Sequence, residues 1–323
     1  MLKVRGCRGD SDLAAVYLCE LADGDLIECV ESVQPPVPRE EKWVLIISTL
    51  KGCPVRCPIC DAGTRYAGRL TAEEMLAQID MMVRRRYPDG IVPAGKLKVQ
   101  FARMGDPAFN PAVIDVLDRL PGLYPGAPGL MPSISTVAPA GTDGFFRRLE
   151  EVKTARYGDG RFQMQFSLHT SSEEARRELV PVRSWSFREM SEWGEGFFRA
   201  GDRRIALNFA PVHGYPVDAR KIREAFSPAA FMIKLTPVNP TASSISSGLR
   251  GIIDPERRET AAPLIDSFRD AGFQTVLSIG ENRENLIGSN CGMYVGEILR
   301  GGVRPEISAP AAAGRSVSAC SSV

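Results

Sequence analysis

Apolar stretches of strand length alternate with amphipathic stretches of helical spacing through most of the chain, from residue 43 onward. The pattern predicts strands at 43–49, 96–102, 131–137, 162–169, 204–211, 231–236 and 274–279. It predicts helices at 71–86, 111–120, 142–152, 172–179, 186–199, 217–226, 255–271 and 291–299. Near-continuous apolar strands in six main strand–helix repeats are typical of a parallel sheet covered by helices. We therefore expect an α/β fold, a partial (β/α)₆ barrel that is open on one side.

The first 42 residues have a different pattern. Two strand-like runs, 14–21 and 26–30, flank a turn at 22–25, which predicts a small β-hairpin. Three prolines among residues 35–38 then form a stiff linker. Residues 301–323 are rich in Pro, Ala, Gly and Ser, and we expect them to be disordered. The expected organisation is a β extension at 1–42, a core at 43–300 and a tail at 301–323.

Composition limits the classes of partner. The chain has 323 residues, with 40 Lys and Arg against 39 Asp and Glu, a net charge of +1. Dedicated RNA-binding proteins usually carry a basic excess, so we expect a small-molecule or peptide substrate. There is no secretory signal and no apolar run long enough to span a membrane. We expect a cytoplasmic location, where the eight cysteines stay reduced.

Three of those cysteines have ligand spacing. Cys53, Cys57 and Cys60 follow the first apolar strand, so three thiolates converge from one short loop. Three thiolates are one short of a closed zinc site or a fully ligated iron–sulfur cluster. An iron–sulfur cluster would then keep one iron open for chemistry. The alternative is a structural zinc site with a fourth ligand such as Cys29 or Cys7.

Other polar motifs fall where the remaining strands end, the edge of a parallel α/β sheet at which active sites form. They are Gly105-Asp106-Pro107, Ser133-Ile134-Ser135-Thr136, Ser167-Leu168-His169 and Asn239 between two prolines. Each also has a plain structural interpretation as a turn, a helix cap or a buried histidine. Cys291 lies at or just before the start of the last helix, where the helix dipole favours a thiolate. Its structural alternative is a small buried side chain.

Together these motifs resemble the class A radical SAM methylases, the RlmN/Cfr-type enzymes that methylate an adenine of ribosomal RNA. The resemblance runs from about residue 25 to 299. It implies a [4Fe–4S] cluster on Cys53, Cys57 and Cys60 and a methyl-carrying thiol at Cys291. It also implies Glu28 as a proton acceptor. The implied S-adenosylmethionine (SAM) contacts are Gly105, Asp106, Ser135, Ser167, Leu168, His169 and Asn239.

Two features differ from that family. The position of its second essential cysteine is Ile46 here, and only a short stretch precedes the hairpin turn where family members carry an RNA-binding domain. We therefore expect that domain to be absent, and product release to use another thiol, such as Cys29, or a different course.

The leading hypothesis is a radical SAM enzyme that delivers a one-carbon unit through Cys291 to an sp² carbon of a small molecule or peptide, with a reductase or flavodoxin-type electron donor. The alternatives are an RNA adenine methylase, a radical SAM enzyme that only abstracts hydrogen, and a zinc module.

Overall fold

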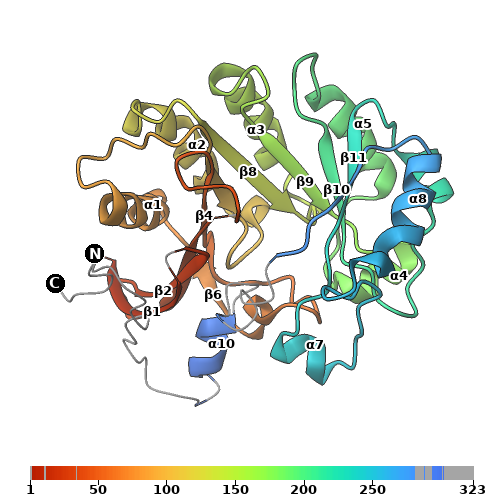
Figure 1. The fold of residues 1–323 in the computed structure, drawn as a ribbon, viewed down its shortest axis with the longest axis horizontal. Helices are drawn as coiled ribbons and strands as arrows, with labels where there is room; N and C mark the ends of the chain where they lie inside the picture. The colour runs from red at the N-terminus through yellow and green to blue at the C-terminus, as the bar shows by residue number, and fades with distance from the viewer. Residues whose placement is uncertain are drawn as a thin grey trace.

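One large, mostly parallel sheet organises the protein (Figure 1). The computed structural model describes residues 2–10, 12–33, 35–280, 287, 293–299 and 301. Ten described strands pair in the order β1-β2-β3-β4-β7-β8-β9-β10-β11-β12. Their bounds are β1 Lys3–Asp10, β2 Ala14–Glu20, β3 Leu26–Ser32, β4 Trp43–Ile47, β7 Leu97–Phe101, β8 Leu130–Thr136, β9 Gln163–Ser167, β10 Ile205–Phe209, β11 Phe231–Leu235 and β12 Thr275–Leu277.

The strands from β4 to β12 run parallel, each against the next. This confirms the predicted α/β architecture with its parallel sheet. Within the described residues β1 and β12 are the two ends of the sheet and do not pair, so the barrel stays open as expected.

Helices cover the outer face of this curved sheet. Figure 1 shows α1, α2, α3, α5 and α8 as an arc around the strands, whereas α7 and α10 lie away from the arc. The helices are α1 Ala72–Arg86, α2 Ala112–Leu123, α3 Asp143–Arg156, α4 Glu173–Leu179, α5 Phe187–Phe197, α6 Ala219–Ala225, α7 Ala242–Ser246, α8 Ala262–Asp270 and α10 Met293–Leu299. The predicted capping box that opens α1, formed by Thr71 and Glu74, is present. No helix in the described ranges is long and apolar enough to cross a bilayer.

The two faces of the parallel strands differ in chemistry. On β7, Leu97, Val99 and Phe101 are fully buried, whereas Lys98 and Gln100 line a cavity. Buried and cavity-lining residues also alternate on β4, where Val44 and Ile46 line the cavity, and on β11, where Lys234 does, because successive side chains point to opposite faces. The inner face is thus more polar than the expected near-continuous apolar strands implied, and the apolar core lies between the sheet and the outer helices.

The N-terminal segment is part of the same sheet. The predicted hairpin forms as β2 and β3, and an additional strand, β1, pairs with β2. Antiparallel pairing of β3 with β4, in which Val30 lies opposite Ile46, joins the segment to the parallel strands. The division of the chain into 1–42, 43–300 and 301–323 remains a prediction, and residues 302–323 lie outside the described residues.

Candidate active site

A cavity of about 810 Å³ lies on the inner side of the sheet and includes the ends of the parallel strands. Most of the residues singled out from the sequence line it: Cys53, Cys57, Cys60, Gly105, Asp106, Ser135, Ser167, His169 and Asn239. Leu168 is fully buried beside it. Cys291 lies outside the described residues. The predicted cluster ligands and SAM contacts therefore share one cavity, whose volume is typical of sites for cofactors and small ligands.

The cysteine loop extends from the main sheet, and its two ends pair with each other. Strands β5 Leu50–Gly52 and β6 Tyr66–Arg69 pair at its base, and the amide of Cys53 donates to the carbonyl of Arg65 at 3.1 Å. Gly52 has φ +88°, and a Cβ there would lie 1.7 Å from the Arg65 carbonyl oxygen. Only glycine fits this position, immediately before the first cysteine.

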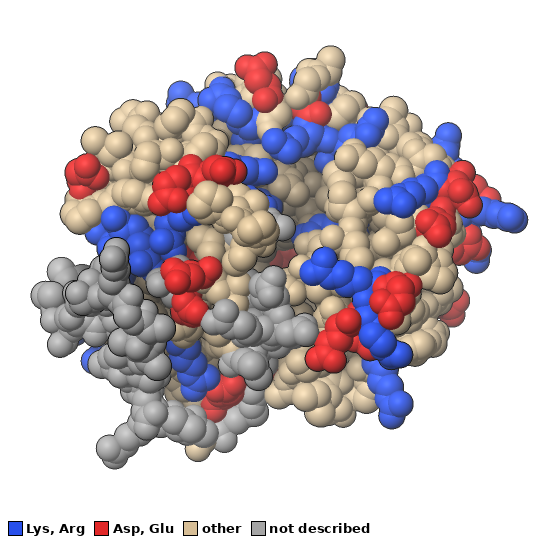
Figure 2. Space-filling view, viewed as in Figure 1, with Lys and Arg blue, Asp and Glu red and all other residues tan. Residues whose placement is uncertain are grey.

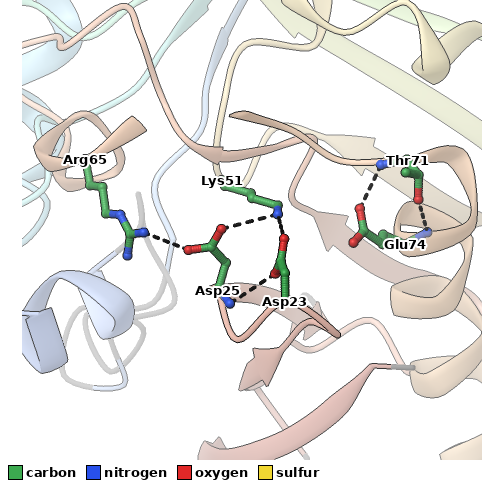
Figure 3. A network of polar contacts seen from close by, with 6 residues as sticks. All are labelled: Asp23, Asp25, Lys51, Arg65, Thr71 and Glu74. Atoms are coloured by element: carbon green, nitrogen blue, oxygen red, sulfur yellow. Dashed lines mark hydrogen bonds and ion pairs between the residues drawn. The ribbon is translucent and has the colours of Figure 1, made fainter. Parts of the chain in front are cut away.

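Ion pairs join the base of the loop to the N-terminal hairpin (Figure 3). Lys51, at the start of the loop, pairs with Asp23 and with Asp25, the latter at 3.2 Å. Arg65, at the end of the loop, pairs with Asp25 at 2.7 Å. The hairpin turn predicted at 22–25 thus braces both ends of the cysteine loop.

The far side of the loop is attached to α7. The carboxylate of Asp61, directly after Cys60, accepts hydrogen bonds from the backbone of Ala242 at 3.2 Å and of Ser243 at 2.8 Å. It also accepts one from the Ser243 hydroxyl at 2.7 Å. Asn239 lies three residues before α7, so this contact places it opposite the cysteines. A carboxylate at a helix N-terminus is favourable, but no pattern in the sequence indicates which helix Asp61 would reach.

The donor set fits an iron–sulfur cluster. The three cysteines come from one braced loop, line one cavity and are not joined in disulfides. Burial raises the pKa of Cys53 to about 11, so its thiolate form needs a cation beside it. Among the described residues no three His, Cys, Asp or Glu side chains are grouped to hold a single metal ion. A [4Fe–4S] cluster differs from a site for a single metal ion, because each cysteine binds a different iron atom of the cluster.

Asp106 joins two strand ends. Its carboxylate accepts hydrogen bonds from the hydroxyl of Thr136 at 2.7 Å, the amide of Val137 at 2.6 Å and the amide of Ala108 at 3.0 Å. Burial raises its pKa to about 6, although these hydrogen bonds oppose the shift. The preceding Gly105 has φ +94°, with the Leu50 side chain against the place of a Cβ. Asp106 therefore fixes the shape of the predicted SAM-binding turn as well as lining it.

His169 has an unusual backbone. Its φ of +68° is in the left-handed region, uncommon for a residue with a side chain, and such conformations often occur at functional sites. Its Nδ1 accepts a hydrogen bond from the amide of Ala210 at 3.2 Å. Burial lowers its pKa to about 4, and the nearby Arg176 adds to the shift. The imidazole is therefore neutral near pH 7, with the proton on Nε2.

Arg176 is a residue that sequence reasoning missed. Its guanidinium is buried and donates to the carbonyls of Val137 at 2.8 Å and Ser167 at 3.1 Å, at the ends of β8 and β9. Burial lowers its pKa to about 10, whereas Cys57, Glu173 and Asp106 oppose that shift. It places a positive charge close to the cysteine loop. Its position on a short amphipathic helix gave no sequence signal, because most helical arginines are exposed.

Glu28 forms a buried ion pair with Arg103, 2.6 Å between Oε1 and the guanidinium. Its other oxygen accepts a hydrogen bond from the amide of Val295 in α10 at 3.0 Å. Burial raises the pKa of the carboxyl, while Arg103 opposes the shift. Glu28 is fully buried and does not line the cavity, whereas Arg103 does. Its role as a proton acceptor stays a prediction.

The two positions considered for product release differ in their access to the cavity. Ile46, which stands where the resembled family has a cysteine, lines the cavity. Val30 and Ser32 of β3 line the cavity. Cys29 directly precedes Val30 in the strand, so its fully buried side chain is on the opposite face, away from the cavity. Burial, followed by a hydrogen bond with Cys19, raises the pKa of the Cys29 thiol. Its position gives no support to Cys29 as the releasing thiol.

Curated proteins of one kind match most of this chain. A probable dual-specificity RNA methyltransferase RlmN from Heliobacterium modesticaldum is 29% identical over 300 residues, which cover 90% of this chain and 71% of that protein. The proteins of the same name from Streptomyces coelicolor and Thermus thermophilus are 29% and 27% identical, over 76% and 90% of this chain and 66% and 76% of their own lengths. No family model matches the chain.

The chain is a homologue of the RlmN-type radical SAM methyltransferases. A crystal structure of a radical SAM methyltransferase from Sphaerobacter thermophilus has the same fold, with a TM-score of 0.70 at 20% identity, over 90% of this chain and 80% of that one. The homology identifies an enzyme of the radical SAM methyltransferase kind and implies a [4Fe–4S] cluster and SAM as cofactors. The resemblance inferred from the motifs is confirmed.

The expected small-molecule or peptide substrate is wrong, because the homologues are named RNA methyltransferases. The net charge of +1 is a poor indicator of the class of substrate. Many surface arginines are cancelled locally by acidic neighbours, such as Arg84 by Asp80 and Arg156 by Asp118. A total charge does not reveal where the remaining cations gather.

Proposed function

We propose that this protein methylates an RNA adenine at carbon, with a [4Fe–4S] cluster on Cys53, Cys57 and Cys60 and with Cys291 as the methyl carrier. The proposal is supported by the RNA methyltransferase names of its homologues. The observation that carries it is that the three cysteines open into one cavity with Gly105, His169 and the other predicted SAM contacts. When bound, the cluster and SAM supply one-electron cleavage and the methyl group.

The chain's own residues would position and shield the reactants. In this proposal the backbone of Gly105 faces the ligand in the cavity, and Asp106 and Arg176 hold the surrounding strand ends in place. His169, neutral with its proton on Nε2, presents a hydrogen-bond donor to the cavity. Glu28, which pairs with Arg103, accepts a hydrogen bond from Val295 of α10, and this helix begins two residues after Cys291. None of the six described cysteines is in a disulfide, in keeping with activity in the reducing cytoplasm.

The test is methylation of RNA by the whole protein after anaerobic reconstitution with iron and sulfide. SAM with an isotopically labelled methyl group, a reductant and RNA would be supplied, and digested nucleosides analysed by mass spectrometry. We expect labelled methyladenosine from the wild type, and none from Cys57→Ala or Cys291→Ala. Cys19→Ala, a buried cysteine that does not line the cavity, is the matched control and should retain activity.

Peptide mass spectrometry of the same samples follows Cys291 itself. A labelled methyl group on Cys291 in the wild type supports the carrier role. Cleavage of SAM without a methyl group on either Cys291 or RNA would contradict the proposal and favour an enzyme that only abstracts hydrogen.

A further inference from the structure

Two lysines project from the sheet into the cavity. Lys98 is on β7 and Lys234 is on β11, and both line the cavity together with Gln100, Gln165 and Asn208. Strand alternation explains their direction, since Val99 and Ile233, their neighbours on the same strands, are fully buried on the helix side. Figure 2 shows Lys and Arg side chains bordering the hollow near the middle of the molecule.

Within the part of the chain that the structure describes, Lys98 and Lys234 have no acidic partner, whereas other lysines do. Lys51 pairs with Asp23 and Asp25, and the buried Lys153 pairs with Asp202. The hydrogen bond of Lys234 to a described residue goes to the neutral amide oxygen of Gln165, at 3.2 Å. Lys98 has neither a hydrogen bond nor an ion pair with any described residue.

The surrounding charges make this arrangement unfavourable without a ligand. Burial lowers the pKa of Lys98 well below its usual range, and the charged neighbours Lys234, Lys96, Lys42 and Arg203 all lower it further. Burial also lowers the pKa of Lys234, with a further contribution from Lys42. Positive groups gathered in one cavity repel one another, and a buried charge is normally paired.

We propose that Lys98 and Lys234 form a binding site for an oxyanion group, a carboxylate or a phosphate, inside the cavity. An anion between them would neutralise both ammonium groups, and the neighbouring amides of Gln100, Gln165 and Asn208 would supply further hydrogen-bond donors. This site lies on the inner face of β7 and β11, in the same cavity as the cysteine loop, and its existence does not depend on RNA being the substrate. Two sources share the chemistry: the carboxylate of SAM and the phosphate of a nucleotide.

The first measurement is calorimetric titration of the cluster-free protein with inorganic phosphate. We expect Lys98→Met and Lys234→Met, which keep most of the aliphatic side chain, each to weaken binding at least tenfold. Lys221→Met, on the exposed surface of α6, is the matched control and should bind phosphate as the wild type does. Equal phosphate binding by the wild type and both cavity variants, or no binding by the wild type, would overturn the site.

Thermal unfolding shows whether weaker phosphate binding by a variant comes from a folding defect. Because removing an unpaired buried charge relieves repulsion, we expect the ligand-free Lys98→Met variant to unfold at a higher temperature than the wild type. A variant that binds poorly and also unfolds at a lower temperature would contradict the proposed role, since it would make Lys98 a structural residue.

Two ligand pairs distinguish the sources. If the anion is the SAM carboxylate, SAM will bind more tightly than decarboxylated SAM to the wild type, and the difference will vanish in Lys98→Met. If the anion is a nucleotide phosphate, adenosine monophosphate will bind the wild type more tightly than adenosine does, and this difference will vanish in Lys98→Met. Either result supports the oxyanion site, and neither measurement requires methyl transfer, so the site can stand when the RNA proposal fails.

Discussion

The carboxylate of Asp61 lies 2.8 Å from the backbone nitrogen of Ser243, although 182 residues separate the two in the chain. This contact fixes the cysteine loop against the N-terminus of α7, and so sets the loop opposite Asn239. A loop that must present three thiolates to one cluster needs such external support, because loops without it are mobile.

Asp61→Ala should loosen the cysteine loop. We expect a loss of about 1–3 kcal/mol in the free energy of unfolding, because the backbone donors at the start of α7 lose their acceptor. We also expect less iron per chain after reconstitution, measured by metal analysis. Asp218→Ala, which removes the analogous cap of α6, is the control and should lose stability without losing iron. Equal iron content in both variants would show that the Asp61 contact does not organise the loop.

Arg176→Met should disturb the strand ends beneath the predicted SAM site. The carbonyls of Val137 and Ser167 would lose a charged donor in a buried setting, which costs about 3 kcal/mol of stability. We expect urea unfolding at a lower midpoint and weaker SAM binding by calorimetry. Arg188→Met, an exposed residue on α5, should change neither quantity. Wild-type SAM affinity in Arg176→Met would refute the positioning role.

Glu28→Gln should leave the buried guanidinium of Arg103 without its counter-ion. Breaking a buried ion pair by removing one partner typically costs about 3–5 kcal/mol. The double variant Glu28→Gln/Arg103→Met should recover part of that loss, because it removes the stranded charge. Chemical unfolding of the wild type, Glu28→Gln, Arg103→Met and the double variant gives the coupling energy, and additive losses would argue against the pairing. The exposed pair Arg5–Glu20 serves as a reference, for which we expect no measurable coupling.

Asp106 should make stability depend on pH between about 4 and 6. Its pKa is raised from 3.8 to about 6 in the folded protein, so its contribution to stability is fully present below pH 3.8 and is lost as the pH rises through 6. The stability of the wild type relative to Asp106→Asn should therefore be about 2 kcal/mol greater at pH 4.5 than at pH 7.5. His169 titrates in both proteins, so its contribution cancels. A difference that is independent of pH would contradict the raised pKa.

His169 should stay neutral until the solution is distinctly acidic. Its pKa is lowered to about 4, so the stability that it contributes is present above pH 6.5 and is lost as the pH falls through 4. The chain has two histidines, so His213→Gln leaves one imidazole to follow by proton NMR. We expect its midpoint near pH 4. A midpoint near 6.5 would mean that the side chain is hydrated and not held by the amide of Ala210.

The sequence by itself determined the local features of this protein. Apolar periodicity predicted the parallel strands and covering helices, because core-facing residues must recur at the spacing of each element. The cysteine spacing and the strand-end motifs predicted a shared site, since parallel strands bring their ends to one edge of the sheet. The capping box at Thr71 and the hairpin turn at 22–25 were equally visible, because both depend on residues a few positions apart.

Only the tertiary structure decided which distant groups meet. The pairing of Asp61 with Ser243, of Glu28 with Arg103 and of Arg176 with two strand ends depends on how the sheet curves and where the helices pack. The same is true of Lys98 and Lys234, which the sequence does not distinguish from other charged residues. Side-chain alternation along β7 and β11, together with the curvature of the sheet, directs both lysine side chains into one cavity. Burial there lowers the pKa of each lysine.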